Sequence, residues 1–168
     1  EADKAAHLLA VADAFALPVV FMADNPGVRA GPAAEQAGAQ RAAARLFVAQ
    51  RRLRGPKLHV TVRKAFGFGS SVMAMNPFDH QTTTLAFPGV ELASMPADSG
   101  GEAAGLDQGE RAVARRRQAA GAYRTAAAMG YDDVIDPREL RNRLLAALAT
   151  SGRDPVPREP ARRPGITP

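Results

Sequence analysis

The chain is organised around the segment Leu58-His59-Val60-Thr61-Val62-Arg63-Lys64-Ala65-Phe66-Gly67-Phe68-Gly69-Ser70-Ser71. Its first half predicts a buried strand over residues 58–63, which runs through a glycine-bearing turn into a short helix over residues 70–75. A helix N-terminus leaves backbone N–H groups without partners, and its aligned peptides give it a partial positive charge. Such a turn favours a carbonyl oxygen that becomes negative during a reaction. We therefore take it as the candidate chemical centre.

The first half of the chain predicts two units of helix, buried strand and glycine loop. The first unit has a helix over 4–16 that Asp3 caps, a strand over 19–23 buried on both faces, and a glycine-rich loop over 24–31. A long helix over 32–54 leads to the central strand. The apolar face of the first helix is expected to consist of Leu8, Val11, Ala12 and Phe15. This alternation predicts an α/β fold with a mostly parallel sheet.

The second half predicts shorter strands and longer helices. Two short strands are expected over 82–87 and 90–95, followed by a polar segment with a short helix near Glu102. A strong helix over 110–129 is expected to end at Gly130 in a left-handed cap.

The end of the chain predicts one more helix and a tail. The helix begins at Pro137 and continues to about residue 150, because four leucines share one face. They are Leu140, Leu144, Leu145 and Leu148. From Ser151 onward prolines and arginines dominate. We therefore expect one domain over 1–150 and a disordered tail over 151–168.

Composition excludes several classes of function. The 168 residues include no cysteine, so thiolate catalysis and cysteine-ligated zinc are excluded, and a reducing compartment is expected. The apolar run over 17–23 is too short to span a bilayer, and no basic region followed by a cleavage site opens the sequence. No histidine spacing suggests a metal site, and His59 and His80 are expected to be structural or surface residues. We expect a soluble cytoplasmic protein without a membrane contact.

The formal net charge of +5 raises the question of an anionic partner. Two basic groups supply much of it: Arg41, Arg45, Arg51, Arg52, Arg54 and Lys57, and Arg111, Arg115, Arg116, Arg117 and Arg124. Both lie on predicted amphipathic helices, and the few aromatic residues form no base-stacking platform. Solvated helix faces are therefore favoured over any specific anionic partner. If there is such a partner, coenzyme phosphates or an acidic carrier protein would suit these arginines as well as nucleic acid does.

Six motifs in order carry a resemblance to a known family. They are Asp3-Lys4-Ala5-Ala6, Asp13-Ala14-Phe15-Ala16-Leu17-Pro18, Asn25-Pro26-Gly27-Val28-Arg29-Ala30-Gly31, Arg63-Lys64-Ala65-Phe66-Gly67-Phe68-Gly69, Val90-Glu91-Leu92-Ala93-Ser94-Met95, and Gly130-Tyr131-Asp132-Asp133-Val134-Ile135-Asp136-Pro137-Arg138-Glu139. Over about residues 3–148 the chain resembles the C-terminal half of a biotin-dependent acyl-CoA carboxyltransferase subunit of the propionyl-CoA carboxylase β type.

The resemblance implies a crotonase-like fold of stacked ββα units and a shared active site. In that family the site lies between an N-terminal type of domain, which carries most of the coenzyme A site, and the C-terminal type, which carries much of the biotin site. The implied reaction transfers carboxyl from carboxybiotin to the α-carbon of an acyl-CoA. The implied partners are an N-terminal-type domain or chain and a biotin carboxyl carrier protein, in a homo- or hetero-oligomer.

The resemblance also implies site residues. The turn over 66–71 would supply two backbone N–H groups, on Phe68 and Gly69, that hold the biotin ureido oxygen as it becomes enolate-like. Other residues expected near biotin or substrate are Gly27, Val28, Gly31, Gly67, Ser70 and Ser71. The small Ser71 suggests an acyl chain bulkier than acetyl. No metal is expected in this chain.

Alternatives remain at this point. Phe68 stands where the family usually has glycine, so its ring either packs beneath the turn or obstructs the site. The chain could then be a non-catalytic assembly subunit, or an acyl-CoA decarboxylase or hydrolase of the same fold. Ser70 or Ser71 could simply cap the helix. Whether the chain is a split subunit, a fragment or an inactive relative stays open.

Overall fold

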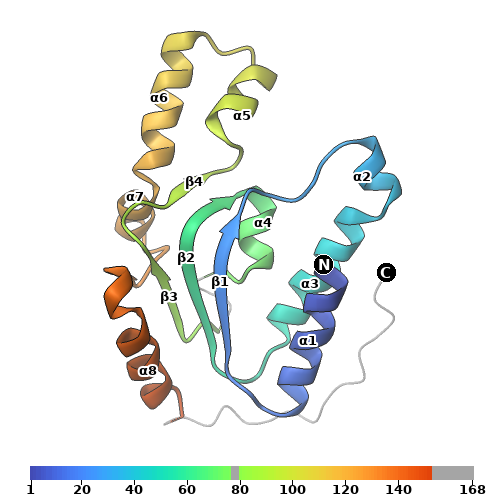
Figure 1. The fold of residues 1–168 in the computed structure, drawn as a ribbon, viewed down its shortest axis with the longest axis vertical. Helices are drawn as coiled ribbons and strands as arrows, with labels where there is room; N and C mark the ends of the chain where they lie inside the picture. The colour runs from blue at the N-terminus through green and yellow to red at the C-terminus, as the bar shows by residue number, and fades with distance from the viewer. Residues whose placement is uncertain (77–79, 153–168) are drawn as a thin grey trace.

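Five strands form one sheet in the computed structural model, which describes residues 1–76 and 80–152 (Figure 1). In chain order they are β1 (Val19–Asn25), β2 (Lys57–Phe66), β3 (Thr83–Ala86), β4 (Glu91–Ala93) and β5 (Asp133–Val134). The order across the sheet is β1-β2-β3-β5, and β4 pairs with the C-terminal part of β2 beyond β3. The described pairings are all parallel. The predicted parallel α/β sheet is confirmed, with β2 at its centre.

Helices cover both faces of this sheet, and a helical hairpin projects from one end (Figure 1). They are α1 (Ala2–Ala14), α2 (Pro32–Gln36), α3 (Ala39–Arg51), α4 (Gly67–Val72), α5 (Ala97–Ala103), α6 (Gln108–Ala119), α7 (Gly121–Ala127), the 3-10 helix η1 (Pro137–Glu139) and α8 (Leu140–Ser151). α5 and α6 form the hairpin. No helix in the described ranges is both long and apolar enough to cross a membrane.

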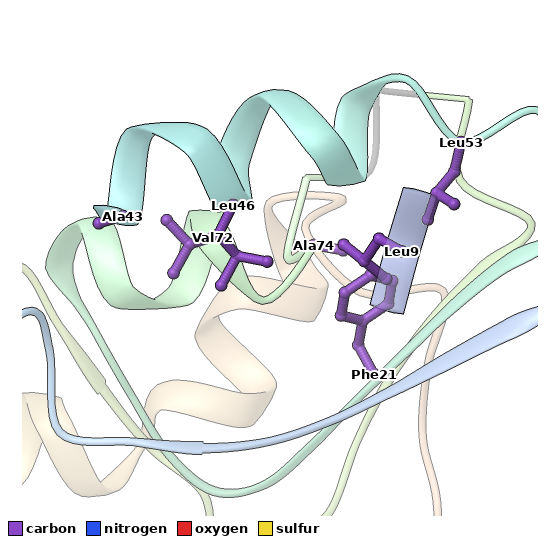
Figure 2. Close-up of a cluster of buried hydrophobic side chains, with 7 residues drawn as sticks. All are labelled: Leu9, Phe21, Ala43, Leu46, Leu53, Val72 and Ala74. Atoms are coloured by element: carbon purple, nitrogen blue, oxygen red, sulfur yellow. The ribbon is translucent and has the colours of Figure 1, made fainter. Parts of the chain in front are cut away.

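The main apolar cluster fills the space between α1, α3, α4 and β1 (Figure 2). Its buried members are Leu9, Phe21, Ala43, Leu46, Leu53, Val72 and Ala74. A second cluster on the opposite face of the sheet joins Val60, Leu85 and Ile135 to α8. Burial of each large apolar side chain contributes roughly 1.5–3 kcal/mol. The main cluster therefore holds α4 against α3.

Two predictions for the first unit are wrong in detail. Helix α1 begins at Ala2, and Asp3 does not cap it; the Asp3 carboxylate instead pairs with Arg45, 2.8 Å away. The buried face of α1 contains Leu9 and Ala12, whereas Leu8 and Phe15 are 65% and 73% exposed. The predicted stripe was therefore rotated by about one residue, because many alanines leave the apolar period ambiguous.

Strand β1 is buried on one face only, contrary to the prediction. Phe21 and Ala23 are buried, while Val20 and Met22 are exposed. Successive side chains of a strand point to opposite faces, and the helices α1 and α3 cover only the Phe21 side. β1 also lies at an edge of the described sheet. An unbroken apolar run therefore did not guarantee burial.

Both long predicted helices are interrupted. The helix expected over 32–54 divides into α2 and α3 at Gly38, which has a left-handed φ of 76°. The helix expected over 110–129 divides into α6 and α7 at Ala120, and Asp107 and Glu110 form a capping box before α6.

The left-handed residue after α7 is Met129, with a φ of 61°, and not Gly130 as predicted. Gly130 is required for space, because a Cβ there would lie 2.5 Å from the Thr125 methyl.

The remaining elements follow the predictions closely. The short helix near Glu102 is α5, and the helix that starts at Pro137 is η1 followed by α8. Of its four leucines, Leu140 and Leu144 pack on the sheet and Leu145 is exposed. The disorder predicted for the tail concerns residues from 153 onward, which lie outside the described residues.

Candidate functional site

Helix α4 follows β2 without an intervening loop. Phe66, still extended at φ −113° and ψ 132°, is its N-cap, and α4 begins at Gly67. The predicted helix over 70–75 was therefore placed three residues too late. Because the first turn of a helix leaves its N–H groups without helical partners, the N–H groups of Phe68 and Gly69 both belong to this set. Neither serine caps α4; the Ser70 hydroxyl donates to the Gly67 carbonyl at 2.7 Å.

Gly67 permits the abrupt change from strand to helix. Its φ is +52°, a conformation that side chains disfavour. A Cβ on Gly67 would also lie 2.7 Å from the carbonyl oxygen of Ser94, just after β4. Both constraints require glycine here. The start of α4 is therefore seated against the end of β4.

Gly69 brings the two glycine loops together. A Cβ on Gly69 would overlap the side-chain oxygen of Asn25 and lie 2.8 Å from the Cα of Gly27. The Gly27 N–H donates to that same Asn25 oxygen at 2.8 Å, and Gly27 has a φ of 108°. The loop after β1 thus packs directly on the first turn of α4.

Other predicted residues have local packing roles. The Phe68 side chain is 42% exposed, and its ring centroid lies 5.5 Å from that of Phe47 on α3. Val28 packs against the main apolar cluster, and Gly31, with a φ of 105°, is the N-cap of α2. The Ser71 carbonyl accepts hydrogen bonds from the side chains of Gln50 and Asn76 at 3.4 and 3.0 Å. The structure therefore brings Gly27 of the loop after β1 to the turn that contains Gly67, Gly69 and Ser70. Val28 and Gly31 belong to the same loop as Gly27 but lie away from the turn.

A cavity of about 1050 Å³ opens beside the turn. Gly67 and Ser70 line it on one side, and α5, α6 and α7 line it on the other. Its helical wall includes two exposed arginines, Arg117 and Arg124. Phe68 and Gly69 are not among the described residues that line it. The acidic Glu110 lies on the same wall, and the cavity is large enough for a cofactor-sized ligand.

A layer of buried polar side chains lies beneath α4, and sequence reasoning missed most of it. His59 Nδ1 lies 2.7 Å from the Met73 carbonyl oxygen, and His59 Nε2 lies 2.8 Å from the Thr61 hydroxyl. That hydroxyl lies 2.7 Å from the Tyr131 hydroxyl. Burial lowers the pKa of His59 to about 4 and raises that of Tyr131 to about 12, so both are neutral at pH 7.

The missed signal was a polar residue at every second position of β2. Lys57, His59 and Thr61 alternate with apolar residues and are all buried. Lys57 Nζ lies 3.1 Å from the side-chain oxygen of Gln50, which is also buried. The prediction that His59 is structural and lies along a strand face agrees with this placement. No group of three side chains in the described part of the chain could hold a metal ion.

Comparison with known proteins identifies the family. Residues 1–166 match the carboxyl transferase domain. The chain is 36% identical over 159 residues to the uncharacterized carboxylase YngE of Bacillus subtilis, and 32% identical over 158 residues to a putative propionyl-CoA carboxylase beta chain of the same organism. Each alignment covers 88% of this chain and 31% of the relative, so the chain spans about a third of the relatives' length.

Solved structures agree with the sequence match. The crystal structure of the transcarboxylase 12S hexamer with methylmalonyl-coenzyme A is 29% identical to this chain, with a TM-score of 0.85 over 99% of this chain and 33% of that one. The likeness confirms the expected crotonase-like α/β fold. On the sequence match and this fold together, the chain belongs to the carboxyl transferase domain family.

Proposed function

We propose that this chain is the C-terminal-type half of a carboxyltransferase, which transfers carboxyl from carboxybiotin to the α-carbon of an acyl-CoA. The observation that carries the proposal is the turn from Gly67 to Ser70, which opens α4, packs on the loop after β1 through Gly69, and lines a large cavity through Gly67 and Ser70. The family match supplies the reaction class. Relatives named for propionyl-CoA and methylmalonyl-CoA chemistry support an acyl-CoA substrate.

The N–H groups of Phe68 and Gly69 are proposed to donate to the biotin ureido oxygen. Carboxybiotin on its carrier protein supplies the carboxyl group and, once decarboxylated, the base for the α-proton. Preorganised backbone donors need no reorganisation when negative charge develops on the oxygen. Gly67 and Ser70, which line the cavity, would contact the bound ring, and the Ser70 hydroxyl donates to the Gly67 carbonyl.

The Phe68 ring is compatible with this role. The ring packs against Phe47 of α3, and the backbone N–H of Phe68 is still present. A backbone donor does not depend on the identity of its side chain. The alternative, an assembly subunit without catalysis, is supported by the same residue, because the half-exposed Phe68 ring could obstruct a ligand at the turn.

A partner is required by the proposal. The chain spans about a third of its relatives, and the coenzyme A half of the site is expected on an N-terminal-type domain. The hexamer described for the 12S subunit supports an oligomer of some kind. The acyl chain bulkier than acetyl that Ser71 suggests is tested by offering acetyl-CoA and propionyl-CoA side by side.

The test replaces the Phe68 amide by an ester, with an α-hydroxy acid analogue of phenylalanine. This change removes one N–H donor and keeps the ring. In a complex with carrier and N-terminal-type chain, transfer of labelled carboxyl to acyl-CoA is expected to fall about a hundredfold or more. Phe68→Ala, which keeps the N–H and loses the ring, is the matched control and should retain transfer. Equal rates for the ester and wild type would refute the assignment, and turnover gained only in Phe68→Gly would favour the assembly subunit.

A further inference from the structure

The C-terminal end of α4 is held by side-chain donors from outside the helix. The last carbonyl groups of a helix have no helical partners. Here the Ser71 carbonyl accepts from Gln50 and Asn76, and the Ala74 carbonyl, two residues past the end of α4, accepts from Gln81. Gln50 belongs to α3, so these contacts tie α4 to a neighbouring helix. A six-residue helix has fewer than two turns, so its direction depends on such hydrogen bonds from outside the helix.

His59 makes the contact from the sheet to the Met73 carbonyl, the C-cap of α4. A carbonyl oxygen only accepts, so Nδ1 of the neutral ring carries the proton. Nε2 therefore accepts from the Thr61 hydroxyl, so the Thr61 oxygen is left to accept from Tyr131. The Tyr131 hydroxyl also lies 3.5 Å from Met75 Sδ, which is a weaker acceptor. The hydrogen bonds run in one direction from Tyr131 to Met73. This relay fixes the tautomer and the plane of the His59 ring.

The opposite end of α4 is fixed by contacts with backbone. Gly67 is seated against the Ser94 carbonyl, and Gly69 against the Gly27 backbone. The helix is about 9 Å long at 1.5 Å per residue, so a shift at the Met73 end turns the amides at its start. Catalytic donors are sensitive to displacements of this kind.

We propose that His59 is a positioning residue, which holds α4 through Met73 in the orientation that presents the Phe68 and Gly69 N–H groups. The inference rests on the proposed function of those groups. It assigns a role in the reaction to a buried side chain that does not touch substrate. An apolar side chain of similar size would fill the same space but leave the Met73 carbonyl without its donor.

Three variants separate positioning from packing. His59→Leu removes the donor, and His59→Asn restores one, because the asparagine amide nitrogen lies close to the place of Nδ1. The control is Thr84→Val. Thr84 pairs with His59 in the register of β2 and β3 and is fully buried, and its hydroxyl makes no hydrogen bond within the described residues. Both His59→Leu and Thr84→Val replace a buried polar side chain by an apolar one in the same part of the sheet. Only His59→Leu removes the hydrogen bond to the Met73 carbonyl at the end of α4.

The first readout is hydrogen exchange of the α4 amides in the full chain. His59→Leu is expected to speed exchange of the Ser71 and Val72 amides about fivefold or more relative to amides of β2. His59→Asn should restore slow exchange, and Thr84→Val should not change it. Unchanged α4 exchange in a folded His59→Leu variant, or failure of Asn to restore it, would overturn the proposal. If the Leu variant does not fold, His59→Gln replaces it, since its amide matches Nε2 instead of Nδ1.

The second readout is carboxyl transfer in the reconstituted complex. We expect His59→Leu to lower kcat about tenfold or more with KM little changed, and His59→Asn to recover most of it, because a positioning residue acts on the transition state. Loose α4 amides with normal kcat would overturn the positioning role. Absence of transfer in the wild-type complex would instead refute the proposed function, and the exchange experiment would still decide whether His59 holds α4.

Discussion

Gly69→Ala tests whether the contact between the two glycine loops is as close as the structure shows. Two effects oppose one another. Alanine is the better helix former and would add roughly 0.5–1 kcal/mol of stability in α4. Its Cβ, however, would lie 2.8 Å from the Cα of Gly27 and would overlap the Asn25 side-chain oxygen. Forcing such a contact costs about 1–3 kcal/mol, and displacing Asn25 loses its bond to Gly27, worth about 1 kcal/mol.

The steric effect should win, because the Gly27 neighbour is backbone and cannot rotate away. We expect Gly69→Ala to lower the free energy of unfolding by about 2 kcal/mol and Tm by roughly 4–8 °C. The assay is urea denaturation followed by circular dichroism. The control is Gly89→Ala, where a Cβ would meet nothing within 4 Å and no stability should be lost. A Gly69→Ala protein as stable as the Gly89→Ala control would refute the reasoning.

Further predictions concern the ring beside the turn, the buried histidine and one ion pair. Phe68→Ala removes a half-exposed ring from Phe47 and should lower the free energy of unfolding by about 1 kcal/mol in urea titration; no loss would deny the contact. Burial lowers the pKa of His59 from 6.5 to about 4. As the pH falls, this side chain is therefore protonated in the unfolded chain before it is protonated in the folded one. The free energy of unfolding should decrease by up to about 3 kcal/mol as the pH falls from 6.5 to 4. His59→Asn should remove that share when both proteins are denatured at pH 7 and at mildly acidic pH, and identical pH dependences would contradict the burial. Asp13→Asn removes the 2.8 Å ion pair with Arg54. Because both side chains are partly exposed, the free energy of unfolding should fall by no more than about 1 kcal/mol, and by less at high salt. Denaturation at two salt concentrations measures both effects.

Residues close together in the sequence made the elements and their order predictable. The strand, glycine turn and helix of residues 58–71 were visible because local backbone preferences act over a few neighbouring residues. The parallel sheet followed from the alternation of helices and strands. The six ordered motifs led to the family, which the comparisons confirm. The assignment of the Phe68 and Gly69 N–H groups as donors to the biotin oxygen came from the same family resemblance, and it remains a prediction.

Other features depended on contacts between distant parts of the chain. Which face of α1 is buried was not evident among its alanines, and β1 turned out to be half exposed because nothing described covers Val20 and Met22. The polar layer beneath α4 joins His59 to Tyr131 through Thr61, and no local period relates these residues.

The turn after β2 shows where sequence and tertiary structure divide. By itself the sequence determined that a strand ends in glycines at a helix N-terminus, because glycine and helix preferences are local properties of the chain. Only the tertiary structure decided that α4 begins at Gly67, that Gly69 must be small, and that His59 lies 2.7 Å from the Met73 carbonyl. Asn25, Gly27 and Ser94 constrain the start of α4, and the pairing of β2 with β1 and β4 brings them there. Close approach in space is a property of the packed chain, and a single sequence does not contain it in its spacing.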